Sequence, residues 1–571
     1  MRARAVLSSR TCPELAEGVI RYGPGEGVML CAPVTGATVA EQHRQAAEAK
    51  AEGADIVELR LDYLDRLETA EELLELIMGC PLPALVTYRP TWEGGKYNGE
   101  EAPRLAMLRL ASVMGAAIVD VELKAAERFF SVKDDLDETV SRRLTEVFGE
   151  TFPRARFLVS HHDYERTGSR GELLALVERA RATGADAVKF VTTAHCASDA
   201  LRVLHVLRDT VASGLPAIGL AMGEPGLPSR VLAGAAGGLL TFGTLDSAGG
   251  TAPGQPSLSD LCNVYDAKHV KPQSRVLGVV GDPVAHSRGP AIHNAALRVR
   301  FLRDVYVPFH VVDFDAFLRE ATSSGGLSID GLSVTVPHKQ AALAAASSVD
   351  AAARRAGAAN TLVRERDGWS AHNTDVGAVV RAVKLGVARR SGALAADAPP
   401  SAADATSLKG TTLLVLGAGG AARALATGAV DAGARVIVAN RTLSRAEEVA
   451  RVANEGLAEP RAEAVSLEEV KAGRVRADVL ANTTTIGMQP RIDESPLPAA
   501  EVAKFGVVFD AVYTPLRTKM LRDAEAAGCT TVTGDVMFIG QAADQFELFT
   551  GLPPPVEIMQ AKLTELLTAG H

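Results

Sequence analysis

Residues 185–192 read Ala-Asp-Ala-Val-Lys-Phe-Val-Thr, and this apolar stretch carries Lys189 in its middle. Short apolar runs of this length are typical of buried strands. Seven further runs occur in the first half of the chain, and most gaps between them hold helix-forming stretches such as 40–52 and 171–183. The eight runs are residues 28–34, 56–61, 84–88, 116–123, 156–160, 187–192, 217–222 and 238–243.

Eight strand-and-helix units in about 240 residues are typical of an α/β fold of the (β/α)8 barrel type. The pattern alone does not separate a closed barrel from an open, doubly wound sheet. In such barrels the chemistry lies at the carboxyl ends of the strands. The polar side chains found at these ends are Glu58, Arg60, Asp62, Arg89, His162 and Lys189.

The composition excludes several classes of protein. At about 150 residues per domain, 571 residues suggest three or four domains or two large ones. The formal net charge of −9 argues against a general nucleic-acid-binding protein, which needs a basic face. The six cysteines form no CxxC pair, so we expect neither a disulfide scaffold nor a structural zinc site. Histidines and carboxylates show no metal-ligand spacing, and we expect no metal.

The N-terminal residues do not resemble a secretory signal or a full transit peptide, and a trimmed transit peptide stays an alternative. Arg2, Arg4 and Arg10 are soon followed by Glu14 and Glu17, without the apolar core of a secretory signal. No apolar run in the chain reaches the roughly 20 residues of a membrane-spanning helix. We therefore expect a soluble intracellular protein without membrane or nucleic-acid partners, in the plastid or the cytoplasm.

The second half contains further strand–helix units. Residues 251–273 are polar and turn-rich, and we expect them to hold the last helix of the barrel and a short joint. A new strand begins at Val276. Farther along, strand 413–416 runs into Gly417-Ala-Gly419-Gly420-Ala421 and then a helix. Small residues in this setting allow close backbone approach, and the helix N-terminus stabilises a pyrophosphate.

The strand after the glycine motif indicates which dinucleotide is bound. This strand ends in Asn440-Arg441-Thr442-Leu-Ser-Arg445. An acidic residue at that point would bind the ribose hydroxyls of NAD, whereas arginines suit the additional phosphate of NADP. The motif therefore predicts an NADP-binding Rossmann domain, and the alternative is a tight turn followed by an exposed basic loop.

A lysine inside an apolar strand has two interpretations. Lys189 is either a strand-end lysine whose amine reaches solvent or an imine-forming nucleophile. Burial disfavours the charged form of an amine and leaves more of the nucleophilic free base. His162 is placed to transfer protons, and the arginines Arg60, Arg89 and Arg230 can bind a carboxylate and hydroxyls. Each of these residues, taken alone, is as well explained by a structural role.

Six motifs in the first half follow one another in a distinctive order. They are Glu58-Leu-Arg60-Leu-Asp62, Thr87-Tyr-Arg89-Pro-Thr-Trp-Glu93, Ser160-His-His162-Asp, Lys189, Met222-Gly-Glu-Pro-Gly-Leu-Pro-Ser-Arg230 and Ala252-Pro-Gly-Gln255. In order and spacing, residues 28–265 resemble type I 3-dehydroquinate dehydratase. The resemblance implies that Lys189 forms an imine with 3-dehydroquinate, that His162 moves the proton and assists loss of water, and that Glu93 orients His162.

The same resemblance implies a set of substrate-binding residues. Arg230 would hold the carboxylate, and a loop of residues 249–255 would close over the site. The family usually has serine where Thr251 stands, so the hydroxyl is retained. The further contacts would come from Glu58, Arg60, Arg89, Thr251 and Gln255.

Motifs of the second half resemble another family. They are Gly281-Asp-Pro-Val-Ala-His286-Ser287, Ser333-Val-Thr335-Val-Pro-His-Lys339, Ala359-Asn360-Thr, Asn373-Thr-Asp375, Asp510-Ala-Val-Tyr513 and Gly540-Gln541. Together they resemble shikimate dehydrogenase over residues 276–568. The order of the two halves resembles the plant-type bifunctional dehydratase–dehydrogenase.

The second resemblance implies a catalytic pair and a domain division. Lys339 would deliver a proton to the carbonyl oxygen as hydride arrives from NADPH, and Asp375 would hold that lysine and a substrate hydroxyl. The expected domains are the barrel at 28–265, a substrate domain at 276–385, a Rossmann domain at 409–535 and returning helices at 536–571. Substrate would contact Ser287, Gly289, Thr335, Asn360, Tyr513 and Gln541. The cofactor would contact Gly417, Gly419, Gly420, Ala421, Asn440, Arg441, Thr442, Arg445 and Gly534.

One position departs from the dehydrogenase family. The family normally shows Ser-x-Ser-Pro at the carboxylate site, but here the sequence is Ser287-Arg-Gly289-Pro. A hydrogen bond to a charged group contributes roughly 1.5–3 kcal/mol, so shikimate binding would weaken about tenfold or more. The vacated space instead suits quinate, and relatives that act on quinate resemble this chain in having glycine there. Thr335 remains as in shikimate enzymes, so the sequence leaves the preference between shikimate and quinate open.

Three functions follow from these patterns. The leading one is a shikimate-pathway enzyme that converts 3-dehydroquinate to 3-dehydroshikimate and reduces it to shikimate with NADPH. The second replaces the reductive half with a quinate dehydrogenase. The third is an inactive metabolite sensor, which is disfavoured because binding alone requires neither of the two reactive lysines.

Overall fold

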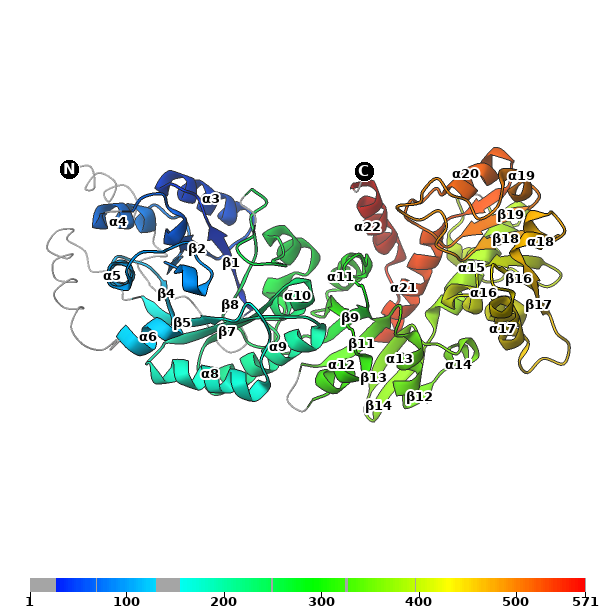
Figure 1. Ribbon diagram of the computed structural model, residues 1–571. Coiled ribbons are helices and arrows are strands. Elements are labelled where there is room, and N and C mark those ends of the chain that lie inside the picture. The colour runs from blue at the N-terminus through cyan, green and yellow to red at the C-terminus, as the bar shows by residue number, and fades with distance from the viewer. Residues whose placement is uncertain are drawn as a thin grey trace. The chain divides into compact units, whose positions relative to one another are not determined.

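The computed structural model describes residues 27–67, 69–129, 155–247, 250–323, 327–395 and 397–569. The chain divides into two compact units. The first unit extends to Val276 and also takes residues 283–285 and 303–329, and the second takes the remainder of the chain. Figure 1 traces the chain from blue at its start to red at its end. The four-domain boundaries expected from the sequence stay predictions.

A parallel eight-stranded sheet forms the centre of the first unit, in the order β7-β6-β5-β4-β3-β2-β1-β8. Strand β8 pairs with β1, and the N–H of Leu239 donates 2.8 Å to the carbonyl of Ala217 where β7 begins. The sheet is therefore a nearly closed barrel, which confirms the predicted fold. Its strands are β1 (Met29–Val34), β2 (Ile56–Arg60), β3 (Ala84–Thr87), β4 (Ile118–Glu122), β5 (Arg156–His162), β6 (Ala187–Thr193), β7 (Ala217–Met222) and β8 (Leu240–Phe242).

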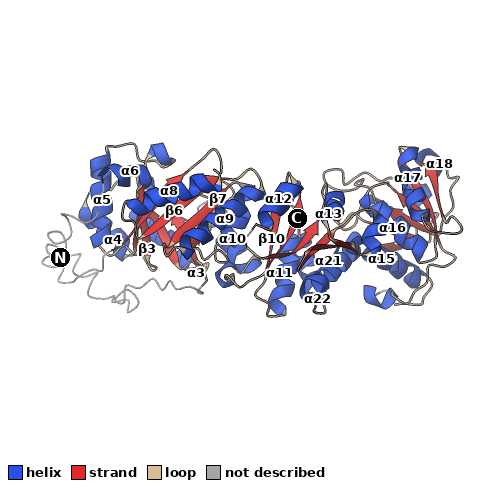
Figure 2. Cartoon of the chain, turned by 90° about the horizontal axis from the view of Figure 1, so that it is seen from below, coloured by secondary structure: helices blue, strands red, loops and turns tan. Residues whose placement is uncertain are grey.

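Helices surround the strands of this unit, as Figure 2 shows. Thr38, Thr69 and Ser169 are N-cap residues, and each forms a reciprocal capping box at the start of its helix. The local sequence therefore determines where these helices begin. The helix expected within 251–273 is only a π-helical turn at Asp260–Val264 and a 3-10 turn at Ala267–His269. The helices are α3 (Val39–Ala51), α4 (Ala70–Met78), α5 (Glu101–Val113), α6 (Leu123–Phe129), α8 (Arg170–Ala182), α9 (Ala197–Ala212) and α10 (Leu227–Val231).

Alternation along the barrel strands places the polar side chains. Successive strand residues point to opposite faces, so every second residue faces the barrel interior. The deepest interior layer is an apolar cluster that includes Cys31, Ile56, Leu85, Ile118, Leu158, Ala187, Ile218 and Leu240. Two residues farther along several strands, the interior becomes polar, at Glu58, Thr87, Asp120, Ser160 and Lys189. The apolar floor thus supports a polar layer toward the carboxyl ends.

The second unit begins with a mixed sheet in which β9, β11, β13, β14 and β12 follow one another. Residues 303–329, which belong to the first unit, hold β10 (Val305–His310) and α12 (Phe314–Ala321). The strands of this sheet that lie mainly in the second unit are β9 (Val276–Gly281), β11 (Ile329–Val334), β12 (Ser348–Val349), β13 (Thr361–Glu365) and β14 (Gly368–His372). The accompanying helices are α11 (Gly289–Val299), α13 (Lys339–Ala345), α14 (Ala351–Ala356) and α15 (Thr374–Arg390).

A parallel six-stranded sheet follows, in the order β17-β16-β15-β18-β19-β20. The order reverses between β15 and β18, and ligands of such sheets bind at this switch point. Its strands are β15 (Thr412–Leu416), β16 (Arg435–Asn440), β17 (Ala462–Ser466), β18 (Val479–Asn482), β19 (Val507–Asp510) and β20 (Thr530–Val532). Its helices and the closing pair are α16 (Gly420–Asp431), α17 (Leu443–Asn454), α18 (Leu467–Lys471), α19 (Ala499–Val502), α20 (Lys519–Ala526), α21 (Gly534–Thr550) and α22 (Val556–Ala569). Among the residues described, none of these helices combines the length and apolarity needed to cross a bilayer.

Candidate active sites

Lys189 lies buried in the barrel between two carboxylates. Its Nζ atom is 3.4 Å from Oδ2 of Asp120 and 3.8 Å from Oε1 of Glu58, and it stands 4.4 Å above the ring centre of Phe242. The side chain does not reach solvent, which excludes the strand-end interpretation. Negative charges at these distances stabilise a positive charge on this nitrogen.

Arg89 is fixed by a buried charged network. Its guanidinium donates to Asp120 at 2.6 Å, to Glu122 at 2.9 Å and to the hydroxyl of Ser160 at 2.7 Å. Arg104 of α5, which is fully buried, approaches the other oxygen of Glu122 at 2.7 Å. Arg89 therefore enters the pocket with a fixed geometry.

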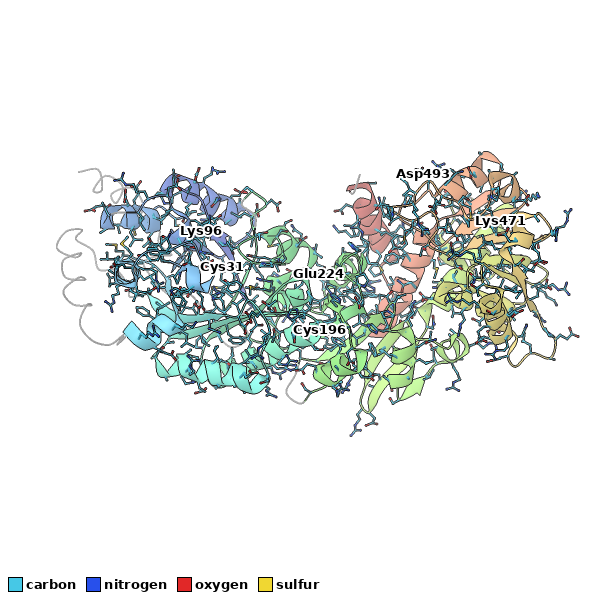
Figure 3. All side chains as sticks on the ribbon, in the orientation of Figure 1. Cys31, Lys96, Cys196, Glu224, Lys471 and Asp493 are labelled. Atoms are coloured by element: carbon cyan, nitrogen blue, oxygen red, sulfur yellow. The ribbon has the colours of Figure 1, made fainter. Side chains whose placement is uncertain are left out.

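Arg60 is held in a similar way by its near neighbour Asp62. Its Nε and Nη2 atoms donate to the two oxygens of Asp62 at 2.9 and 2.7 Å. Asp62 also accepts from the backbone N–H of Lys96 at 3.1 Å. Lys96, labelled in Figure 3, belongs to the loop that follows β3. Asp62 thus positions Arg60 and ties it to a neighbouring loop.

His162 and Glu93 meet at the carboxyl end of β5. The backbone N–H of His162 donates to Oε1 of Glu93 at 2.8 Å, and its Nδ1 atom lies 3.4 Å from the same oxygen. Burial raises the pKa of Glu93 to about 7. Burial, together with the positive charges of Arg89 and Lys189, holds the pKa of His162 well below its usual value. The imidazole is thus a neutral base at neutral pH.

Arg230 carries a buried positive charge. It is fully buried on α10, its Nε atom has no hydrogen-bond partner among the described residues, and burial lowers its pKa to about 10. The group remains cationic at neutral pH. A buried guanidinium that forms no ion pair with a carboxylate in the described part of the chain fits an acidic ligand that completes its hydrogen bonds.

A single pocket collects most of the predicted dehydratase residues. It has about 530 Å³ of empty volume, including its open mouth. Thr251 donates to Oε1 of Gln255 at 3.3 Å, while Nε2 of Gln255 is buried and has no hydrogen-bond partner among the described residues. Position 249 of the expected closing loop lies outside the described residues. The predicted residues that line the pocket are Glu58, Arg60, Arg89, His162, Lys189, Arg230, Thr251 and Gln255.

The second unit places Lys339 and Asp375 in direct contact. Nζ of Lys339, the first residue of α13, is 2.6 Å from Oδ2 of Asp375 in the first turn of α15. Both side chains keep partial exposure, at 24% and 12%. The pair is therefore formed and remains accessible to a small ligand.

The side-chain amide of Asn360 makes more hydrogen bonds within the fold than the sequence suggests. Its Oδ1 accepts from the N–H of Thr374 and the hydroxyl of Thr361, and its Nδ2 donates to the hydroxyl of Thr374. Gln545 of α21 donates to the carbonyl of Asn360 at 3.1 Å and accepts from Ser333 at 2.8 Å. These bonds hold the start of α15, where Asp375 lies.

Further predicted residues lie on loops and helix starts of the second unit. The hydroxyl of Ser287 accepts from the N–H of Gly289 at 3.2 Å, at the start of α11. Tyr513 stacks on Phe538 with ring centres 4.7 Å apart, and burial raises its pKa. Gln541 donates to the carbonyl of Phe538 at 3.0 Å. Thr335 is partly exposed directly after β11.

The glycine motif forms the predicted strand–turn–helix junction. Gly417 has φ +115°, and a Cβ there would come within 2.8 Å of Oγ1 of Thr483. In contrast, Cβ atoms at Gly419 and Gly420 would meet nothing within 4 Å, so open space faces the N-terminus of α16. At Gly534 a Cβ would collide with the carbonyl of Ala511 at 2.5 Å. The motif has the room and the helix N-terminus that a pyrophosphate requires.

The loop after β16 exposes the predicted basic residues. Arg441 and Arg445 are exposed at the start of α17, and Asn440 donates to the carbonyl of Thr442 at 3.0 Å. Thr442 is the N-cap residue of α17 but makes no capping hydrogen bond with its side chain. The helix N-terminus and two arginines thus remain available to an anion.

Models of known families match both halves of the chain. The model of type I 3-dehydroquinase matches residues 30–272. Those of the shikimate dehydrogenase substrate binding domain, shikimate/quinate 5-dehydrogenase and the shikimate 5′-dehydrogenase C-terminal domain match residues 279–362, 401–509 and 536–564. A chloroplastic bifunctional 3-dehydroquinate dehydratase/shikimate dehydrogenase of Arabidopsis thaliana is 40% identical over 97% of this chain and 86% of its own length. The chain belongs to this bifunctional family.

Other relatives of this dehydratase/dehydrogenase cover one half or the whole chain. A shikimate dehydrogenase (NADP(+)) of Bacillus licheniformis is 37% identical over 51% of this chain and 97% of its own length. A solved structure of dehydroquinate dehydratase and shikimate dehydrogenase from S. pombe is 22% identical, covers 96% of this chain and 100% of that chain, and has a TM-score of 0.40.

Sequence reasoning missed part of the dehydratase site. Asp120, Glu122 and Arg104 were not singled out, although Asp120 and Glu122 alternate along an otherwise apolar run. That alternation was an available signal, because it places both carboxylates on the interior face. Tyr164 also lines the pocket and gave no separate signal in the sequence.

Proposed function

We propose that the barrel dehydrates 3-dehydroquinate through an imine at Lys189 and that the second unit reduces the product with NADPH. The observation that carries the first half is the arrangement around Lys189. A buried amine between two carboxylates shares one pocket with a neutral imidazole and with Arg230, whose Nε has no partner. An acidic ketone supplies a group for each of these side chains.

The dehydration uses the pocket residues in sequence. The free amine of Lys189 attacks the ketone carbon, and the carbonyl oxygen leaves as water, taking one proton from the amine and one from solvent, to give an iminium that Asp120 and Glu58 stabilise. The iminium withdraws electrons, so His162 can remove a proton from the adjacent carbon. His162 then returns this proton to the departing hydroxyl, which leaves as a second water. Hydrolysis of the remaining imine releases 3-dehydroshikimate and restores the lysine.

The other barrel residues bind the substrate in this scheme. Arg230 receives the carboxylate, and Arg60 and Arg89 bind hydroxyls with guanidinium groups fixed by Asp62 and by the Asp120–Glu122 pair. Thr251 and Gln255 contact the substrate from the loop above the pocket. Glu93 accepts a hydrogen bond from the backbone N–H of His162 and lies beside Nδ1 of the ring, so it helps to orient the ring.

The reduction is assigned to the Lys339–Asp375 pair. Bound NADPH supplies the hydride. The ammonium of Lys339 donates a proton to the carbonyl oxygen that becomes the new hydroxyl, and Asp375 holds Lys339 in place at 2.6 Å. Thr335, Asn360, Tyr513 and Gln541 surround the substrate in this assignment.

The cofactor fits the open glycine loop. Gly417, Gly419, Gly420 and Ala421 leave space at the N-terminus of α16 for the pyrophosphate. Asn440, Arg441, Thr442 and Arg445 would hold the ribose phosphate, and Gly534 would allow the backbone to pack close to the nicotinamide. NADP is thus the cofactor that these residues fit. We also propose the four-domain division, with 409–535 as the NADP-binding domain.

A quinate-oxidising second half is the alternative, and Gly289 favours it. Only the hydroxyl of Ser287 is present where the family has two serines, and this hydroxyl already accepts from the N–H of Gly289. The vacated volume suits the extra hydroxyl that quinate carries beside its carboxylate. Shikimate remains the leading substrate because Thr335 is retained. The substrates are small acids, and we assign no nucleic-acid or membrane partner.

A coupled assay tests the whole proposal. Purified protein is given 3-dehydroquinate and NADPH, and the products are identified by mass spectrometry. We expect 3-dehydroshikimate and shikimate to form with oxidation of NADPH. Accumulation of 3-dehydroshikimate without NADPH oxidation would remove the reductive half, and tight binding of 3-dehydroquinate without any conversion would support the sensor alternative.

A further inference from the structure

Tyr164 lies beside the acid–base pair but has no role in the scheme above. It follows His162 by two residues and lines the same pocket. Its ring is nearly parallel to the imidazole, with an interplanar angle of 19° and ring centres 6.1 Å apart. The Tyr164 side chain is half-exposed, whereas the His162 side chain is only 10% exposed.

The hydroxyl of Tyr164 reaches the turn that carries Glu93. It donates to the carbonyl of Glu93 at 3.1 Å. Gly94 follows in the left-handed region, with φ +78°, and a Cβ on it would lie 2.1 Å from the tyrosine oxygen. The turn therefore lacks a side chain at the point where the phenol fits.

The contact between Glu93 and His162 does not by itself fix the imidazole. The strong bond is the 2.8 Å backbone bond, whereas the Nδ1–Oε1 distance of 3.4 Å is at the limit of a hydrogen bond. Nδ1 of His161 also lies 3.8 Å from the same carboxylate oxygen. A second constraint is needed to hold both the turn and the ring plane.

We propose that Tyr164 is a positioning residue of the dehydratase: its hydroxyl anchors the Glu93 turn and its ring sets the plane of His162. This inference rests on the proposed imine chemistry of the barrel. In this role the Tyr164 hydroxyl binds the backbone of Glu93 and does not contact the reacting atoms.

Loss of the Tyr164 hydroxyl should also change the pKa of Glu93. Its carboxyl is buried, which raises its pKa to about 7. If the hydroxyl anchor is lost, the turn loosens, water reaches the carboxyl, and its pKa falls toward the ordinary value. The other titratable and charged groups that face this carboxyl are Arg89, Glu122, Lys124, His161 and His162.

The test compares Tyr164→Phe with Tyr97→Phe. The hydroxyl of Tyr97 donates to the carbonyl of Glu100 at 2.6 Å. The control therefore removes a similar hydrogen bond from the loop that carries Glu93, at a point away from the pocket. For Tyr164→Phe we expect kcat to fall roughly fivefold, which corresponds to one hydrogen bond, with KM changed by less than about twofold. The inflection of the kcat–pH profile near pH 7 should move to lower pH. Tyr97→Phe should match the wild type in all three measurements.

Two further measurements keep the outcomes distinct. The dehydrogenase activity of the same chain reports folding, and we expect it to be unchanged in both variants. Gly94→Ala should reproduce or exceed the Tyr164→Phe defect, because its Cβ occupies the site of the phenol oxygen. Identical kcat and pH profiles in Tyr164→Phe and Tyr97→Phe would overturn the inference, as would a neutral Gly94→Ala. Absence of dehydratase activity in the wild type would instead overturn the proposed function.

Discussion

Asp120 places its Oδ2 atom 3.4 Å from the Nζ atom of Lys189, and both side chains are buried. Burial raises the pKa of Asp120, but Arg89 and Lys189 outweigh it and hold that pKa below its usual value. The carboxylate is therefore ionised throughout the working range. It is a fixed negative charge beside the nitrogen that would become the iminium in the proposed mechanism.

Replacement of this charge should weaken the cationic intermediate. We expect Asp120→Asn to lower the dehydratase kcat by at least about tenfold, since a hydrogen bond to a charged group is worth roughly 1.5–3 kcal/mol. Steady-state rates with 3-dehydroquinate check this. The matched control is Asp55→Asn, which removes a carboxylate bonded to Lys268 at 2.6 Å outside the pocket. Equal rates for the two variants would contradict the role of Asp120.

Glu93 should make the stability of the barrel depend on pH. Its folded pKa of about 7 lies above its ordinary value of 4.5, so ionisation costs stability as pH rises between these values. Glu93→Gln removes this cost. At 1.36 kcal/mol per pKa unit, the variant should gain up to roughly 3 kcal/mol relative to wild type between pH 4.5 and 8. Denaturant unfolding, followed by loss of dehydratase activity or by fluorescence, measures the difference.

A carboxylate with the opposite shift provides the control. Hydrogen bonds from Arg166 and Ser169 lower the pKa of Glu172 to about 2. Its contribution to stability is present above its ordinary pKa and is lost as pH falls toward 2. Glu172→Gln should therefore lose stability relative to wild type as pH rises from 2 to 4.5. A Glu93→Gln variant that followed this second trend would contradict the burial argument.

Arg441 and Arg445 should determine the choice between NADPH and NADH. Removal of either guanidinium should raise the KM for NADPH by about tenfold, because in the proposed site each would bond to a phosphate that NADH lacks. The KM for NADH should stay unchanged. Arg435→Ala is the control, since Arg435 is exposed at the opposite end of β16. Equal effects of the Arg441→Ala substitution on both cofactors would show that the loop does not read the ribose phosphate.

Gly289 should set the substrate preference of the dehydrogenase. Gly289→Ser restores a hydroxyl beside Ser287 and fills the space that suits quinate. We expect the ratio of shikimate to quinate oxidation, measured as kcat/KM with NADP, to rise by about tenfold or more. An unchanged ratio would remove Gly289 from the account of specificity.

The sequence predicted the barrel strands well because alternation and apolar runs are local signals. Lys189, His162 and Arg230 were also identified and line one pocket. Asp120 and Glu122 were missed because their role becomes apparent only when the barrel places Arg89 and Arg104 beside them.

Other features depend on contacts between distant segments. Tyr164 bonds to Glu93 across 71 positions, which no local pattern encodes. Asn360 was expected to offer its amide to a substrate, but Thr361 and Thr374 use most of that amide in the fold. The helix expected within 251–273 is shorter because only residues 260–264 and 267–269 form helical turns there.

Imine trapping at Lys189 tests the central claim most directly. Borohydride is added during turnover of 3-dehydroquinate, and the protein is digested and analysed by mass spectrometry, with Lys189→Met as the control. We predict a reduced, substrate-derived adduct on the peptide that contains residue 189 and no adduct in the variant. Continued turnover with an unmodified Lys189, or an adduct confined to another lysine, would contradict the mechanism.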